Sequence, residues 1–247
     1  MSSYESLAPW YDRLTRDVPY EAFCDFYEEA FRQDGGEFHL LLDLGCGTGT
    51  MISLMGRRGY EMIGTDASVE MLMEASSRCA ELPVPPVLLH QASQRLDLYG
   101  TVDAAYCSLD GMNYIPGEDL PEVFRRLHLF VRPGGLFLFD VRLPEWFHAL
   151  DGQIFVDEVD EPGRELLCLW RADFDEERKA LVYGMDLFQS VGKLWKRTGE
   201  EHVEYAHDPE TLKSMLEAAG FRDVRLRPDC PQGDDGRLFI TAKRDGA

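Results

Sequence analysis

Residues 38–142 alternate short apolar runs with segments of helical periodicity, and this pattern constrains the fold more than any other feature of the chain. The apolar runs cover residues 38–45, 60–66, 86–93, 102–110 and 136–141. They are apolar throughout rather than at every second position, which is typical of strands buried on both faces of a parallel sheet. The alternation therefore predicts an α/β fold with helices on both faces of the sheet.

The pattern changes over residues 151–206, where four strand-like runs follow one another with polar turns between them. Such runs are typical of antiparallel hairpins. A helix follows, with Asp208 as its N-cap and Gly220 at its end, and two further strands complete the chain. The sequence thus predicts an α/β domain of residues 1–150 and 207–247, interrupted by a small antiparallel β insertion.

Composition limits the classes of function that the chain can serve. The 247 residues carry a formal net charge of −20, which disfavours a nucleic-acid partner because such binding depends on Lys and Arg. The six cysteines include no C-x-x-C pair, so neither a disulfide framework nor a metal site is expected. There is no apolar leader and no apolar run approaching about 18 residues, so we expect a cytoplasmic protein without a membrane partner. Monomer and homodimer both stay open.

The run "LLDLGCGTGT" (residues 41–50) places three alternating glycines directly after the first apolar run. A nucleotide phosphate, a dinucleotide and S-adenosylmethionine are the ligands that such a loop could serve. A phosphate-binding loop ends in Gly-Lys-Ser/Thr, and no lysine is near. A dinucleotide fingerprint requires a third glycine where Thr50 stands. Asp43 would repel a pyrophosphate, whereas it suits a ligand with a cationic end.

Asp66 ends the second apolar run. A carboxylate at this position can accept both ribose hydroxyls of an adenosine. Alternatively, it could act as an acid at the N-terminus of the following helix, for which Ser68 is the expected N-cap. The glycine loop upstream favours the ribose interpretation.

Together, the runs "LLDLGCGTGT", "IGTDAS", "AYCSLDGMNYI" and "LFVRPGGLFLFDV" resemble class I S-adenosylmethionine-dependent methyltransferases. The resemblance covers about residues 38–142 and resumes at 208–243. It implies a doubly wound, mostly parallel seven-stranded sheet (the Rossmann-like methyltransferase fold) whose last strand runs antiparallel. It also implies S-adenosylmethionine as cofactor and methyl transfer by in-line displacement.

The resemblance assigns the residues that would contact the cofactor. Asp43 would support the amino-acid end and Asp66 the ribose. The family usually has an acid at the end of strand three, where this chain has Ala92, so Ser93 or the backbone would contact the adenine instead. The full set of cofactor-contacting residues implied is Tyr11, Tyr20, Asp43, Gly45, Cys46, Gly47, Gly49, Asp66, Ala67, Met71, Ala92, Ser93, Ser108 and Leu109.

Asp110 and Asn113, after the fourth apolar run, are the expected catalytic residues; Asn113 could instead anchor its loop. The N-terminal segment resembles a lid, which would bring Tyr11 or Tyr20 over the cofactor. Further candidate bases are His148, His202 and His207.

The inserted sheet would lie over the carboxyl ends of the parallel strands, where open α/β sheets bind ligands. Its aromatic residues could line an acceptor pocket, or pack on themselves or on a second copy; they are Trp170, Tyr183, Phe188 and Trp195. A small-molecule acceptor fits the acidic chain best, and an RNA acceptor stays open. The rival interpretations are a silent or regulatory cofactor-binding protein and a nicotinamide oxidoreductase, which Thr50 disfavours.

Overall fold

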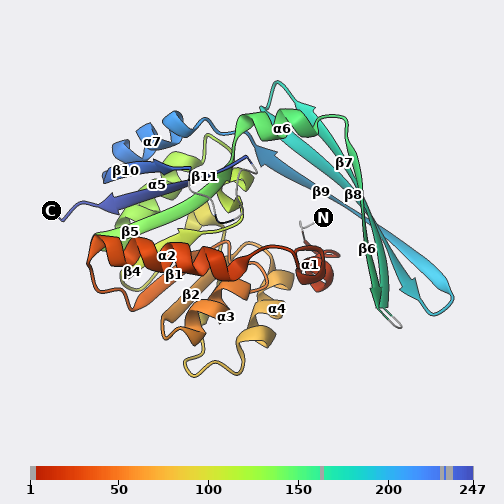
Figure 1. Cartoon of the computed structure of the whole chain (residues 1–247), viewed down its shortest axis with the longest axis horizontal. Coiled ribbons are helices and arrows are strands. Elements are labelled where there is room, and N and C mark those ends of the chain that lie inside the picture. Colours follow the sequence, from red (N-terminus) through yellow and green to blue (C-terminus); the bar gives the residue numbers. More distant parts are fainter. Residues whose placement is uncertain (1–3, 162–163, 229–230, 232–235, 247) are drawn as a thin grey trace.

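The computed structural model describes residues 4–161, 164–228, 231 and 236–246. Within these residues the chain forms a large sheet covered by helices and a second sheet of long strands beside it (Figure 1). The first helix, α1 (Ala8–Leu14), lies between the two sheets.

The large sheet has seven strands in the order β10-β11-β5-β4-β1-β2-β3. Only β11 runs against its neighbours, being antiparallel to both β5 and β10. This topology confirms the predicted doubly wound, mostly parallel sheet with an antiparallel last strand. The strands are β1 (Leu40–Leu44), β2 (Glu61–Asp66), β3 (Val87–His90), β4 (Val102–Cys107), β5 (Val131–Arg142), β10 (Phe221–Arg227) and β11 (Arg237–Arg244).

Helices cover both faces of this sheet. On one face α5 and α7 pack on the strands, and on the other face α2, α3 and α4 do so. The helices are α2 (Tyr20–Asp34), α3 (Thr50–Arg57), α4 (Val69–Cys79), α5 (Leu120–Phe130) and α7 (Pro209–Ala218). The predicted N-caps are confirmed: Ser68 accepts a hydrogen bond from the Met71 N–H, and Asp208 accepts one from the Thr211 N–H.

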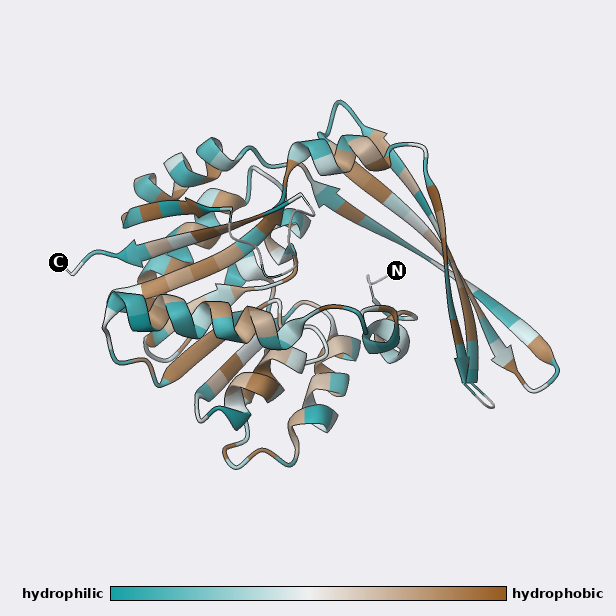
Figure 2. Cartoon of the chain, in the orientation of Figure 1, coloured by the Kyte–Doolittle hydropathy of each residue, from teal (hydrophilic) through white to brown (hydrophobic). Residues whose placement is uncertain are grey.

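Burial on both faces explains why the strands lack an alternating pattern. Successive side chains of a strand point to opposite faces, so in β1 Leu41 packs against α2 and α3 while Leu42 and Leu44 pack on the α5 side. All three side chains are fully buried. Figure 2 shows the resulting hydrophobic strands in the middle of the sheet.

The second sheet has four strands in the order β6-β7-β8-β9, each antiparallel to its neighbour. Their bounds are β6 (Ile154–Glu161), β7 (Arg164–Asp175), β8 (Ala180–Val191) and β9 (Leu194–Tyr205). The sheet thus lies within the predicted insertion of residues 151–206. One of its faces packs on Leu7 and Trp10 of the N-terminal segment, and α6 (Pro144–Leu150) packs on β7 and β8 through Phe147.

Two local features differ from the sequence-based expectation. The fifth strand was expected at residues 136–141, but β5 begins at Val131, directly after α5. Residues 132–135 form an irregularity in its pairing with β4, between the pairs Val102–Val131 and Ala104–Leu136. The sequence also gave no indication of α6, whose seven residues are too few to show a helical period.

None of the helices in the described residues is both long enough and apolar enough to cross a bilayer. Five cysteines are buried as free thiols; the sixth, Cys230, lies outside the described residues.

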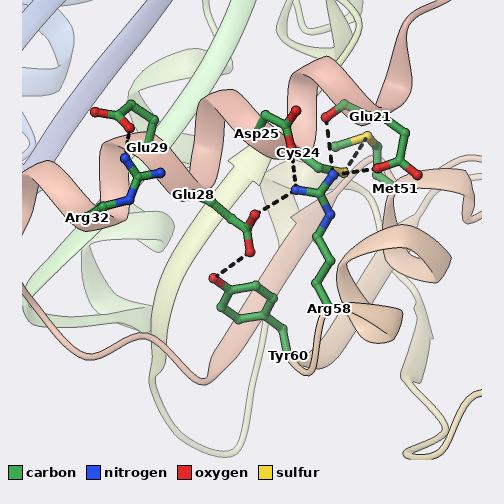
Figure 3. A network of polar contacts seen from close by, with 9 residues as sticks. All are labelled: Glu21, Cys24, Asp25, Glu28, Glu29, Arg32, Met51, Arg58 and Tyr60. Atoms are coloured by element: carbon green, nitrogen blue, oxygen red, sulfur yellow. Dashed lines mark hydrogen bonds and ion pairs between the residues drawn. The ribbon is translucent and has the colours of Figure 1, made fainter.

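Arg58, at the end of α3, binds three carboxylates of α2 (Figure 3). Its guanidinium lies 2.6 Å from both Asp25 Oδ1 and Glu28 Oε2, and it also pairs with Glu21. Glu28 in turn accepts a hydrogen bond from the Tyr60 hydroxyl at 3.2 Å. This network joins α2, which follows the N-terminal segment, to the end of α3 and to Tyr60, the residue before β2.

We expect Arg58→Met to lower the free energy of unfolding by about 1 kcal/mol, because a network of three partners is worth more than one exposed ion pair. The loss should shrink at high salt, which screens exposed charges. Arg32→Met is the matched control, since Arg32 is 70% exposed and pairs only with Glu29 among the residues described. Urea unfolding at low and high salt measures both; equal losses for the two variants would contradict the prediction.

Candidate active site

A cavity of about 650 Å³ opens at the carboxyl ends of β1, β2 and β4. Its wall combines the glycine loop, the N-terminal segment and the inner face of the second sheet. Open parallel sheets bind their ligands at the carboxyl ends of the strands, at the point where the strand order reverses. In this sheet that point lies between β1 and β4.

The glycines of the loop after β1 have different tasks. Gly45 and Gly47 have φ of +75° and +53°, and a Cβ on either would meet no atom within 4 Å, so their bare backbone faces the cavity. Gly49 also has a positive φ of +75°, but a Cβ there would lie 2.9 Å from Ala75 Cβ. Gly49 therefore permits close packing of α3 on α4 and does not line the cavity.

Asp43, on β1, lies in the cavity wall and is only 2% exposed. Its Oδ2 atom is buried and has no hydrogen-bond partner among the residues described. Burial raises the pKa of this carboxyl to about 8, and the nearby Asp66 adds to the increase. A cationic group bound next to Asp43 would stabilise the ionised form of this buried carboxyl.

Asp66 ends β2 and organises the loop opposite. Its Oδ2 accepts the Gly47 N–H at 2.9 Å and its Oδ1 accepts the Ser68 N–H at 2.8 Å. Burial raises the pKa of Asp66, and the N–H donors partly offset this. Each carboxylate oxygen has a second lone pair, so both can also accept a ligand hydroxyl.

The loop after β4 is held in an unusual conformation. Leu109 and Asp110 both have positive φ, +56° and +54°, which non-glycine residues seldom adopt. The fully buried carboxylate of Asp140 on β5 accepts both of their backbone N–H groups at 2.8 Å. Arg237 completes the cluster, since its guanidinium pairs with Asp140 and lies 2.7 Å from Asp110 Oδ1.

Asn113 lies behind the cavity wall and not on it. The side chain is fully buried, donates to the Tyr205 carbonyl at 2.8 Å and accepts the Arg142 N–H at 3.0 Å. It therefore joins the β4 loop to β5 and β9, as the loop-anchor alternative expects, and its side chain does not line the cavity.

The N-terminal segment is tied to the second sheet through Glu200 on β9. This carboxylate accepts the backbone N–H groups of Tyr4 at 3.0 Å and Leu7 at 3.1 Å, and that of Ser6. His202 Nε2 lies 3.1 Å from the same carboxylate. Burial acts to raise the pKa of Glu200, but His202 and the N–H donors outweigh it and lower the pKa below its usual range.

Asp12 ties the same segment to the glycine loop. Thr48 Oγ1 donates to Asp12 Oδ1 at 2.7 Å, and Arg78 of α4 pairs with the same carboxylate. Arg78 also donates to the Thr48 carbonyl at 2.9 Å. Because of these contacts Tyr11 and Tyr20 lie on the cavity wall, as the lid interpretation anticipates.

The second sheet forms the part of the cavity wall that lies across from the glycine loop. Trp170 and Tyr183, two of its four expected pocket residues, line the cavity, together with His202 and Glu204 of β9. Phe188 and Trp195 do not line it.

The structure brings most of the remaining expected residues to this one cavity. Those on its wall are Tyr11, Tyr20, Asp43, Gly45, Cys46, Gly47, Asp66, Ala67, Met71, Ala92, Ser93, Ser108, Leu109 and Asp110. Of the candidate bases, His202 lines the cavity, whereas His148 and His207 do not. His207 is buried behind it, where Nε2 lies 3.0 Å from the Ile115 carbonyl.

The sequence analysis did not identify Asp140, Arg237 or Glu204 as site residues. Asp140 had one signal, being an acid within an otherwise apolar strand. Arg237 and Glu204 had none, because their charges meet those of Asp110 only through long-range contacts.

Comparison with known proteins identifies the class. A family model described as a methyltransferase domain matches residues 41–135. A putative methyltransferase of Geobacillus sp. (strain WCH70) is 28% identical over 98% of this chain and 100% of its own length. One from Bacillus subtilis (strain 168) is 27% identical, covering 98% and 97%. The crystal structure of an S-adenosylmethionine-dependent methyltransferase from Clostridium acetobutylicum superposes with a TM-score of 0.85 at 27% identity, covering 98% of this chain and 99% of that one.

The chain is a class I S-adenosylmethionine-dependent methyltransferase, and S-adenosylmethionine is its cofactor. The cavity fits that molecule on structural grounds. The unpartnered Oδ2 of Asp43 calls for a cationic group, and Asp66 offers acceptors for two hydroxyls. Gly45 and Gly47 have no side chain and no atom near the position that a Cβ would take, so a ligand in the cavity can approach their backbone closely.

Proposed function

We propose that the protein transfers the methyl group to a small-molecule acceptor that binds in the cavity between the glycine loop and the second sheet. The observation that carries this proposal is the continuity of the cavity, whose single wall includes Gly47 and Asp66 at one end and Trp170 and Glu204 at the other. Its volume of about 650 Å³ is in the range of small-molecule sites.

Within the cavity, Asp43 holds the cofactor's ammonium group and Asp66 its ribose hydroxyls. Ala67 and Met71 contact the adenine, with Ser93 and the backbone taking the place of the acid that the family usually has. The cofactor supplies an activated methyl group when bound. The task of the chain is then to align the acceptor with that methyl and to exclude water, which the N-terminal segment serves through its Glu200 and Asp12 contacts.

Relatives of the chain support a small acceptor. One protein, 25% identical over 92% of this chain, is the dTDP-3-amino-3,4,6-trideoxy-alpha-D-glucopyranose N,N-dimethyltransferase of Streptomyces venezuelae. The net charge of −20 weighs against an RNA acceptor.

Incubation of the purified protein with methyl-labelled S-adenosylmethionine tests the proposal. A cell extract is divided into a low-molecular-mass filtrate, an RNA fraction and a protein fraction, and each is added separately. We expect label in the filtrate, and we expect Trp170→Ala to reduce it while S-adenosylhomocysteine still binds. Label in RNA or protein would overturn the acceptor class. Binding of S-adenosylhomocysteine with no label in any fraction would favour the silent or regulatory alternative.

Cofactor binding should release a proton at neutral pH because Asp43 ionises when a cation reaches it. Its pKa of about 8 in the free protein means that the carboxyl is mostly protonated at pH 7. Affinity should therefore rise with pH, by up to about tenfold per pH unit, and level off near pH 8. Calorimetry in two buffers of different ionisation enthalpy counts the protons. Asp43→Asn should abolish the release, and an unchanged proton count in that variant would contradict the assignment.

The same group makes a prediction for the cofactor-free protein. Its folded-state pKa is raised above the unfolded value, so folding takes up a proton between about pH 4 and pH 8. The contribution of Asp43 to stability is consequently present below that window and is lost as the pH rises through about 8.

A further inference from the structure

Glu204 is a buried carboxylate that no cation of the described residues pairs with directly. It is 6% exposed and lies on β9, two residues from His202, so that strand alternation turns both side chains to the cavity side of the sheet. The exposed Glu201 lies on the other side. Nothing assigned to the cofactor uses Glu204, because the expected contacts of that molecule come from the glycine loop and β2.

The charges around Glu204 leave an excess of negative charge. Burial, and then Asp110, raise the pKa of Glu204 to about 8, although Tyr114, Arg142 and Arg237 act in the opposite direction. Arg237 already pairs with both Asp110 and Asp140. The Arg142 guanidinium stacks 4.2 Å from the Trp146 ring centroid. The titratable and charged groups that act on Glu204 or respond to it are Tyr4, Tyr11, Asp110, Tyr114, Arg142, Tyr183 and Arg237.

Aromatic rings line the same end of the cavity. Trp170 and Tyr183 lie edge to face with their centroids 6.3 Å apart, and Tyr4 and Tyr114 lie 6.1 Å apart. The Trp170 Nε1 atom is buried without a hydrogen-bond partner among the described residues. Aromatic faces combined with an uncompensated carboxylate form the usual environment for an alkylammonium group.

We infer, building on the methyl transfer proposed above, that the acceptor is an amine and that Glu204 binds its protonated nitrogen and takes up its proton. Proton transfer from the ammonium to the Glu204 carboxylate restores the nitrogen lone pair. The nitrogen then bonds to the methyl carbon as the carbon–sulfur bond breaks and its electron pair leaves with sulfur. The product is an N-methylammonium and a neutral thioether, and the Glu204 proton passes to solvent.

A carboxylic acid acceptor suits this surface less well. It would add a negative charge beside Glu204 and Asp110, while Arg237 is already bound by two carboxylates. A neutral hydroxyl acceptor would bring no positive charge to stabilise the ionised form of Glu204, which burial and Asp110 disfavour. The amine alone both supplies a positive charge and needs to lose a proton.

Sinefungin tests the inference by direct binding, because this cofactor analogue carries an amine-bearing carbon in place of the methyl-bearing sulfur. Its ammonium group would therefore occupy the place of the transferable methyl. We expect the Kd for sinefungin to be at least about tenfold lower than the Kd for S-adenosylhomocysteine, because sinefungin gains one charge-assisted hydrogen bond. Glu204→Gln should remove this preference and leave S-adenosylhomocysteine binding unchanged, and Glu201→Gln should alter neither.

The outcomes separate this inference from the proposed function. If S-adenosylhomocysteine binds but sinefungin has no advantage, or keeps its advantage in Glu204→Gln, the role of Glu204 is overturned while the methyltransferase proposal stands. If neither ligand binds, the proposed function fails first. The products labelled in the filtrate give a second readout: N-methylamines are expected, whereas methyl esters or ethers would overturn the amine.

Discussion

Asp66→Ala weakens the binding of S-adenosylmethionine and S-adenosylhomocysteine by about 100-fold. The expected loss is about 3 kcal/mol, since two hydrogen bonds to a charged group disappear and each is worth about 1.5–3 kcal/mol. The substitution also releases the backbone N–H groups of Gly47 and Ser68, which the carboxylate holds at 2.9 and 2.8 Å. Calorimetric titration with both ligands measures the effect.

Asp97→Ala is the matched control, because Asp97 is exposed and lies outside the cavity wall. It should bind both ligands as the unchanged protein does. NAD, added as a third ligand, should bind neither protein. Equal affinity in Asp66→Ala and in the control would remove Asp66 from the site, and binding of NAD would reopen the dinucleotide interpretation of the loop.

Arg237→Met lowers the free energy of unfolding by about 3–5 kcal/mol, the cost of leaving a buried charge without its partner. The Arg237 side chain is 2% exposed and that of Asp140 is fully buried. For a chain of this length such a loss shifts the melting temperature by about 10 °C. The variant should also lose methyl transfer, because Asp140 holds the Leu109 and Asp110 backbone at the cavity.

The double variant Arg237→Met/Asp140→Asn distinguishes a charge effect from a packing effect. It removes the buried negative charge of Asp140 that Arg237→Met leaves unpaired. The free energy of unfolding should therefore be at least about 1 kcal/mol higher than in Arg237→Met alone. Arg225→Met, at an exposed position of β10, is the control and should be nearly neutral. A double variant less stable than Arg237→Met would show that the ion pair is not what stabilises this cluster.

The cofactor end of the cavity could be predicted from sequence because its residues are close along the chain. The glycine loop, Asp43 and Asp66 lie within one strand–helix–strand unit, and the order of that unit fixes which ends of the strands meet. The same reasoning put Gly49 at the cavity and left Asn113 between a catalytic and a loop-anchoring role. Motif spacing does not reveal that the bare face of Gly49 is against Ala75, or that the Asn113 carboxamide reaches the Tyr205 carbonyl.

The acceptor end was decided by tertiary structure. Glu200 binds backbone groups nearly two hundred residues away, and Arg237 pairs with Asp110, 127 residues away along the chain. Such contacts have no period and no local signature, since they form only when the second sheet and β11 come to rest beside the cavity. The sequence by itself determined a parallel sheet with a cofactor loop, because strand burial and loop conformation are local properties. Only the fold decided which charges meet Glu204, because the field at a buried group depends on the side chains that packing brings within a few ångströms.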